Sequence, residues 1–154
     1  MGPLIEFKNY KTVLVVVDRA VGYCLLIPTT MRATTIATME LLPNYIFTPQ
    51  GIPTSIVSHT DPAFTYHPWN QTLNTMEIEY KMVAPRHHQT NGQSGRKIRE
   101  VKTAVMTVIT RGHNNWLVPL PQLSLYTNCG YSETIDMSPY KAVYGREYPL
   151  LSTY

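Results

Sequence analysis

The sequence predicts an α/β domain in which strands and helices pack in layers, and three observations favour this class. Residues 12–18 form a continuous apolar run that ends in a carboxylate, a pattern typical of a buried central strand. Residues 94–110 change to a period of 3.6, because their apolar residues recur on one helical face. Strands come first along the chain and are then mixed with helices, which favours helices layered on a sheet.

Four strands are expected. The run at 12–18 is followed by Gly22 in a turn and by a β-rich run at 23–27, so the two runs predict a hairpin. Pro28 should stop the second strand, because proline cannot donate a backbone hydrogen bond. Two further short strands are expected at 54–58 and 78–83.

Five helices are expected from apolar spacing and from the positions of proline. The first covers 31–42, and Pro43 should end or kink it. The others are expected at 68–76, at 94–110 with one apolar face, at 116–126, and in a short segment after Ser138. In the last helix Ser138 serves as the N-cap, Pro139 takes the first helical position and Gly145 closes it.

Length and composition indicate one domain with a real core. The chain has 154 residues, of which 44% are apolar and only 15% charged, too little charge for a disordered tail. No apolar run is long enough to span a bilayer and no signal peptide is visible, so we expect no membrane association. Cys24 and Cys129 lie far apart in the sequence, which favours reduced thiols in an intracellular protein.

Basic residues are concentrated in one segment. The net charge is only +3, but seven of the 13 basic residues lie between Lys81 and Arg111, where Glu100 is the one acidic residue. The rest of the chain is net acidic. A local positive field of this kind fits either a solvated helix face or contact with a polyanion.

Four stretches, in order, resemble the catalytic core of retroviral and gypsy-type LTR-retrotransposon integrases. They are Leu-Val-Val-Val-Asp-Arg at 14–19 with Ile-Pro at 27–28, Gly-Ile-Pro at 51–53 with Ile-Val-Ser at 56–58, His-Gln-Thr-Asn-Gly-Gln-Ser at 88–94, and Met-Ser-Pro-Tyr-Lys-Ala-Val-Tyr-Gly-Arg at 137–146. The matches keep their spacing over about residues 10–150. The resemblance implies a single RNase H-like domain over 1–154, with a central mixed five-stranded sheet and helices on both faces.

The chemistry of that family needs three carboxylates that converge on two divalent metal ions, which activate water or a DNA 3′-hydroxyl. The resemblance places these positions at Asp18, His59 and Gly95. Imidazole is a poor Mg²⁺ ligand and glycine has no side chain, so two of the three ligands are missing. No cofactor is therefore expected. Mg²⁺ or Mn²⁺ would bind only if Asp61, two residues beyond His59, rebuilt a weak site together with Asp18.

We therefore predict a retrotransposon-derived pseudo-integrase that binds the DNA backbone through the segment 87–102. The candidate contacts are basic and polar side chains, namely Arg96, Lys97, Arg99, Lys102, His87, His88, Gln89, Asn91 and Gln93. In a helix Gly95, Arg99 and Lys102 share one face, which flanks the old catalytic groove.

Two alternatives remain open. An active metal-dependent polynucleotidyl transferase would nick DNA and lose this activity on Asp18→Asn. An interaction module that forms a homodimer or binds a chromatin-associated protein would carry exposed apolar residues on 31–42 and 116–126. The resemblance also implies a nuclear protein.

Several candidate residues have purely structural explanations as well. Asp18 can serve as the cap of a strand end, and His59 can be a packed residue. The pair His87-His88 can belong to a polar loop, since no third zinc ligand lies at the required spacing. Trp69 and Trp116 are expected in the core rather than as platforms for base stacking.

Overall fold

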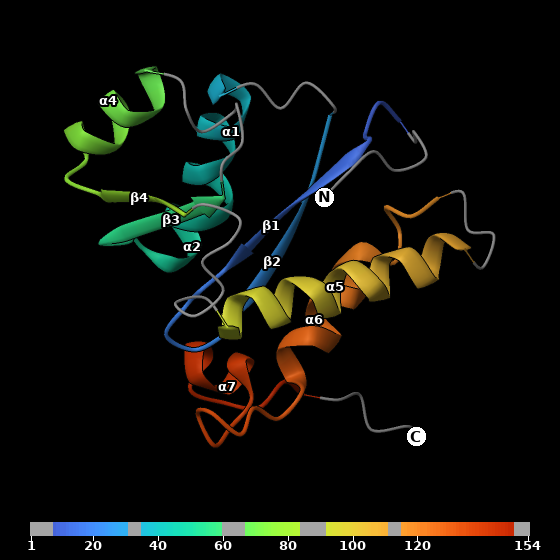
Figure 1. Ribbon diagram of the computed structural model, residues 1–154. Helices are drawn as coiled ribbons and strands as arrows, with labels where there is room; N and C mark the ends of the chain where they lie inside the picture. The colour runs from blue at the N-terminus through green and yellow to red at the C-terminus, as the bar shows by residue number, and fades with distance from the viewer. Residues whose placement is uncertain (1–7, 31–34, 60–66, 84–91, 111–114, 150–154) are drawn as a thin grey trace. The chain divides into compact units, whose positions relative to one another are not determined.

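The computed structural model describes residues 8–30, 35–59, 67–83, 92–110 and 115–149 (Figure 1). The chain divides into two compact units, which are described separately. The first unit combines 1–29 with 91–154, and the second covers 30–90. The prediction of a single domain over 1–154 stays a prediction.

The described residues of the first unit form a hairpin and three helices, namely β1 (Thr12–Val17), β2 (Cys24–Thr29), α5 (Gly92–Thr110), α6 (Leu120–Cys129) and α7 (Pro139–Tyr144). The second unit contains α1 (Thr35–Leu42), the π-helical segment η1 (Pro43–Phe47), α2 (Thr48–Gln50), β3 (Ser55–His59), α4 (His67–Thr75) and β4 (Glu79–Val83). None of the described helices has the length and apolar character needed to cross a bilayer.

The predicted hairpin is confirmed, because β1 and β2 pair in antiparallel register. The Asp18 N–H donates to the Tyr23 carbonyl at 2.8 Å and closes the turn. The expectation that Pro28 stops the second strand is wrong, since β2 continues to Thr29. Along an antiparallel ladder, residue pairs that exchange backbone hydrogen bonds alternate with pairs that do not. Pro28 lies opposite Val13 in a pair of the second kind, so its missing N–H costs no hydrogen bond to β1.

The described residues hold four strands in two two-stranded sheets, β1 with β2 antiparallel and β3 with β4 parallel. The predicted five-stranded sheet is therefore not found in this part of the chain. The strand β1 was expected to be central, yet β2 is its one neighbour among the described residues. An apolar run predicts that a strand is buried, but it does not predict how many strands flank it.

The core of the first unit lies between the hairpin and the long helix α5. Val13 and Cys24 pack against Val101 and Val105, and Trp116 with Leu120 completes the cluster. The helical face predicted for 94–110 is confirmed at Val101 and Val105, which are almost fully buried. Trp116 is 1% exposed, as expected of a core residue.

The second unit has a separate apolar cluster. Leu42 of α1, Trp69 and Leu73 of α4, and Ile78 before β4 form it. Trp69 is fully buried and meets the ring of Tyr80 edge-on at 5.9 Å, so its predicted core role is confirmed.

Helix ends follow proline and glycine as predicted, with one difference at the start of α6. Regular α geometry ends before Pro43, where the wider π-helical turn begins. Helix α6 starts at Leu120 rather than at Trp116, because residues 116–119 form a turn. The ends of α7 are confirmed: the Ser138 Oγ accepts from the Lys141 N–H at 3.1 Å, and Gly145 adopts a left-handed conformation with φ 72°.

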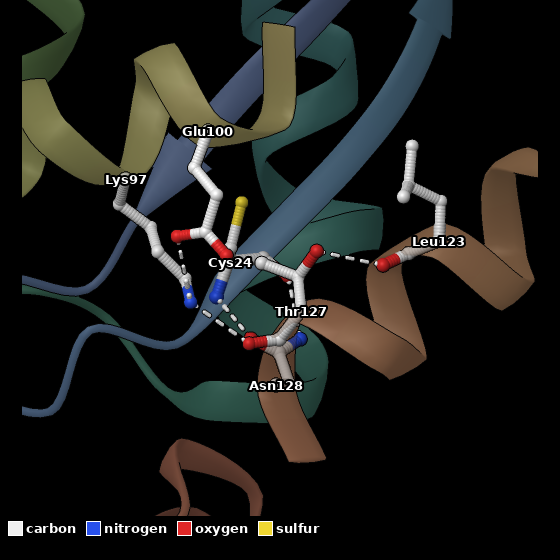
Figure 2. A network of polar contacts seen from close by, with 6 residues as sticks. All are labelled: Cys24, Lys97, Glu100, Leu123, Thr127 and Asn128. Atoms are coloured by element: carbon white, nitrogen blue, oxygen red, sulfur yellow. Dashed lines mark hydrogen bonds and ion pairs between the residues drawn. The ribbon is translucent and has the colours of Figure 1, made fainter. Parts of the chain in front are cut away.

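A buried amide fastens α6 to the outer edge of β2 (Figure 2). The Asn128 Oδ1 accepts from the Cys24 N–H at 2.7 Å, and the Asn128 Nδ2 donates to the Cys24 carbonyl at 2.8 Å. Cys24 lies opposite Val17 in a pair without backbone hydrogen bonds, so both of its backbone groups point away from β1. The Asn128 carboxamide thus takes the place of a neighbouring strand at this residue.

We expect Asn128→Ala to lower the free energy of unfolding by about 2 kcal/mol, because the buried Cys24 N–H would lose its acceptor. The Cys24 carbonyl keeps one donor, since the Ser124 Oγ also donates to it at 3.1 Å. Urea unfolding measures the change. The matched control is Asn70→Ala at an exposed position of α4, which should cost less than about 0.5 kcal/mol. Equal stability of the two variants would contradict the anchoring role of Asn128.

Candidate nucleic-acid interface

Asp18 is exposed in the turn between β1 and β2, and its carboxylate supports that turn. The Oδ1 atom accepts from the Ala20 N–H at 2.7 Å and from the Val21 N–H at 3.4 Å. This Asx-turn arrangement stabilises the chain reversal locally. The explanation of Asp18 as the cap of a strand end therefore has direct geometric support.

A strip of basic residues runs along the first half of α5, and we call Arg96, Arg99 and Lys102 the basic strip. All three are exposed, whereas Val101 and Val105 on the other side of the helix are buried. An α-helix turns by about 100° per residue, so the three side chains of the strip cover about 120° of the helix circumference. Viewed down the helix axis, Gly95 lies between Arg99 and Lys102. Among the described residues no carboxylate forms an ion pair with any member of the strip.

Gly95 is half-buried. Among the described residues beyond its two chain neighbours and the backbone of α5, a methyl group built at this position would meet no atom within 4 Å. The Arg99 Nε donates to the Gly95 carbonyl at 3.5 Å, which directs the guanidinium back towards the first turn of α5. Among the described residues, positive charge without an ion-pair partner therefore borders Gly95.

Lys97 lies on another side of the helix and has a structural role (Figure 2). Its Nζ donates to the Thr127 carbonyl at 2.9 Å and lies 3.6 Å from a Glu100 carboxylate oxygen. Thr127 lies in the last turn of α6, where backbone carbonyls have no intrahelical partner. Lys97 thus fastens α5 to the end of α6, and we leave it out of the phosphate contacts that the sequence suggested.

The first half of α5 lies close to the hairpin end that carries Asp18. Cys24, which pairs with Val17 at this end, lies near Lys97 and Glu100 of α5 (Figure 2). Burial raises the pKa of the Cys24 thiol to about 12, although Lys97 lowers it in part. Both cysteines are free, and Cys24 is a core residue rather than a nucleophile.

Two polyproteins are similar to this chain in sequence, whereas no family model matches it. The Pro-Pol polyprotein of simian foamy virus type 3 (strain LK3) is 29% identical over 145 residues, which is 94% of this chain and 12% of the polyprotein. The transposon Tf2-3 polyprotein of Schizosaccharomyces pombe is 30% identical over 149 residues, or 96% of this chain and 11% of the polyprotein.

Two solved structures share the fold. The HTLV-2 integrase catalytic core domain, determined with magnesium in a trimeric form, has a TM-score of 0.68 at 15% identity and covers 90% of this chain and 89% of that one. A chain of the simian T-cell lymphotropic virus intasome, in complex with the PP2A regulatory subunit B56 gamma, has a TM-score of 0.70 at 16% identity, covering 96% and 54%. The chain thus shares the fold of these integrase cores, and its sequence is similar to a part of retroviral and retrotransposon polyproteins.

The integrase resemblance read from the sequence is thereby confirmed, together with the α/β class of the fold. The chain spans 11–12% of the length of these polyproteins. The activity, substrates and partners of a whole polyprotein therefore do not follow from the relationship alone.

The donor set at the three family positions does not fit a pair of divalent metal ions. Asp18 offers one carboxylate, Gly95 offers no side chain, and His59 at the end of β3 is an imidazole residue. Mg²⁺ requires oxygen ligands, preferably anionic ones. In the part of the chain that the structure describes, no group of three His, Cys, Asp or Glu residues could hold a metal ion.

The remaining candidate residues, or their side chains, lie outside the part of the chain that the structure describes. His87, His88, Gln89, Asn91 and Asp61 lie outside the described residues, and the side chain of Gln93 in the first turn of α5 is not described either. Their assignments as nucleic-acid contacts, or as a metal ligand for Asp61, stay predictions.

Proposed function

We propose that this integrase core binds the DNA backbone without cutting it, and that it is a pseudo-integrase. The basic strip carries the proposal, because Arg96, Arg99 and Lys102 surround the position where the family has its third carboxylate. Removal of that carboxylate leaves a surface on which positive charge has no balancing acid among the described residues. Such a surface attracts phosphate instead of a metal ion.

The dimensions of the strip suit a DNA backbone. Arg96 and Lys102 are six residues apart, which corresponds to about 9 Å along the helix axis. Each strand of a duplex carries one phosphate per about 3.4 Å of axis, so the strip spans two or three phosphates. Gly95 leaves room for a phosphate to approach the helix, whereas a glutamate there would repel it.

Phosphate contacts of this kind need no metal cofactor and carry no sequence information. We therefore propose DNA binding that depends on salt concentration and is indifferent to sequence. A nuclear location is proposed together with this role, since DNA is the partner.

The first test is the salt dependence of duplex binding. Arg96→Gln/Arg99→Gln/Lys102→Gln should reduce the slope of log affinity against log salt by about 3 units, because each lost phosphate contact contributes about 0.9. Fluorescence anisotropy with a labelled duplex measures the slope.

The matched control is Lys8→Gln/Lys11→Gln/Lys81→Gln, which removes three positive charges elsewhere. It should change the slope much less than the strip variant does. Equal slopes for the two triple variants would show that net charge, and not the basic strip, determines binding.

The second test concerns catalysis. With Mg²⁺ or Mn²⁺ and supercoiled plasmid we expect no nicking above the level of the Asp18→Asn variant, because two family ligands are replaced. Gel electrophoresis measures the nicked fraction. Metal-dependent nicking that Asp18→Asn abolishes would instead support an active polynucleotidyl transferase.

A second candidate function is assembly into a homodimer or with a chromatin-associated protein. Large apolar side chains are exposed where the sequence suggested, with Ile36 on α1 62% exposed, Val118 before α6 64% exposed and Tyr126 on α6 79% exposed. Exposed apolar groups of this size are typical of interaction surfaces. Light scattering that finds a monomer at every concentration would exclude the homodimer.

A further inference from the structure

Four tyrosine rings gather at α7 and at the hairpin, and we call Tyr23, Tyr140, Tyr144 and Tyr148 the tyrosine cluster. The ring centre of Tyr140 lies 4.5 Å from that of Tyr144 and 5.2 Å from that of Tyr148. Tyr23 meets Tyr144 edge-on at 6.0 Å, and their hydroxyl groups are 3.4 Å apart.

The cluster presents aromatic surface to solvent. Tyr144 is 47% exposed and Tyr148 is 37% exposed, whereas the core residue Trp116 is 1% exposed. Aromatic side chains that serve only to fill a core are buried, and each exposed ring here keeps surface that a ligand can cover. A group of rings in mutual contact therefore extends to the surface of the first unit.

The segment that carries three of these rings is held in place by polar contacts. The Ser138 Oγ donates to a Glu147 carboxylate oxygen at 2.9 Å, and the other carboxylate oxygen lies 3.5 Å from the Lys141 Nζ. Gly145 ends α7 in the left-handed conformation. Because these contacts link the two ends of the segment, the rings are already arranged before a ligand binds, which lowers the entropic cost of binding.

The charges around the cluster favour an anionic ligand. Arg146 lies between Tyr144 and Tyr148 in the sequence, is exposed, and has no ion pair among the described residues. Glu147 is balanced by Lys141. The pKa of the Tyr23 hydroxyl is raised, first by burial and then by the hydrogen bond with Tyr144, so the ring stays neutral.

The cluster and the basic strip belong to the same unit of the chain. Tyr23 directly precedes Cys24, and Cys24 lies near Lys97 and Glu100 in the first half of α5 (Figures 1 and 2). One unit therefore carries both positive charge for the backbone of a duplex and aromatic rings for unpaired bases.

We infer that the tyrosine cluster is a stacking site for an unpaired nucleobase, with Arg146 as the contact to the neighbouring phosphate. This inference rests on the proposed DNA binding and names its preferred ligand, which is DNA with a single-stranded overhang. Every base offers an aromatic face, so the site tolerates any sequence.

The test compares a blunt duplex with the same duplex carrying a five-nucleotide 3′ overhang, at one salt concentration. Wild type should bind the overhang substrate about tenfold more tightly, as expected of one stacked base. Tyr144→Ala/Tyr148→Ala should abolish this preference and leave the affinity for the blunt duplex unchanged. Tyr144→Phe/Tyr148→Phe should keep the preference, because the rings remain.

Three results would overturn the inference. They are equal affinity of wild type for both substrates, an equal loss on both substrates in the alanine variant, and a lost preference in the phenylalanine variant. Circular dichroism melting shows whether each variant is folded. If the double alanine variant is unfolded, the single variant Tyr144→Ala is measured in its place. A failure of the proposed DNA binding can be told apart from a failure of this inference. If the proposed DNA binding is wrong, the Gln variant of the basic strip binds the blunt duplex like wild type.

Discussion

The hydrogen bonds between the Asn128 carboxamide and the backbone of Cys24 determine how the first unit is assembled. They attach α6 to the edge of the hairpin, where no further strand is found among the described residues. Lys97 then attaches α5 to the end of α6 through the Thr127 carbonyl. Because α5 is fixed by Lys97 on one side and by its buried valines on another, Arg96, Arg99 and Lys102 are left facing solvent. The position of the basic strip thus depends on the packing of the α5 valines and, through α6, on one buried amide.

The same fold can serve catalysis or binding according to a few side chains. A catalytic integrase core holds metal ions between its carboxylates and the phosphates of DNA, and the metal charge overcomes the repulsion between the two. The sequence resemblance assigns two of those carboxylate positions to Gly95 and His59, and basic residues flank Gly95 in α5. We propose that these arginine and lysine side chains contact phosphate directly. Asp18 persists with a separate task, since its carboxylate supports the hairpin turn.

Local features of the fold were predictable from the sequence, whereas long-range partners were not. The hairpin, the buried face of α5 and the ends of α7 follow from apolar period, glycine and capping residues. The bonds between Asn128 and Cys24 join residues 104 positions apart, and Lys97 reaches Thr127 across 30 positions. Nothing in the local pattern marks either pair, so Lys97 looked like the other cations of its segment. The ring contacts of the tyrosine cluster also join distant segments, and the tyrosine content alone did not reveal them.

Restoring a carboxylate at position 95 tests the central claim most directly. Gly95→Ala is the matched control, because an added methyl group meets no neighbouring atom and alanine favours a helix over glycine. Duplex affinity should be measured for both variants in the presence of a chelator. The account predicts that Gly95→Glu binds DNA several-fold more weakly than wild type at low salt, because the new carboxylate repels the phosphate, while Gly95→Ala binds like wild type. Equal affinity of both variants would contradict the claim that DNA phosphate occupies this place beside α5.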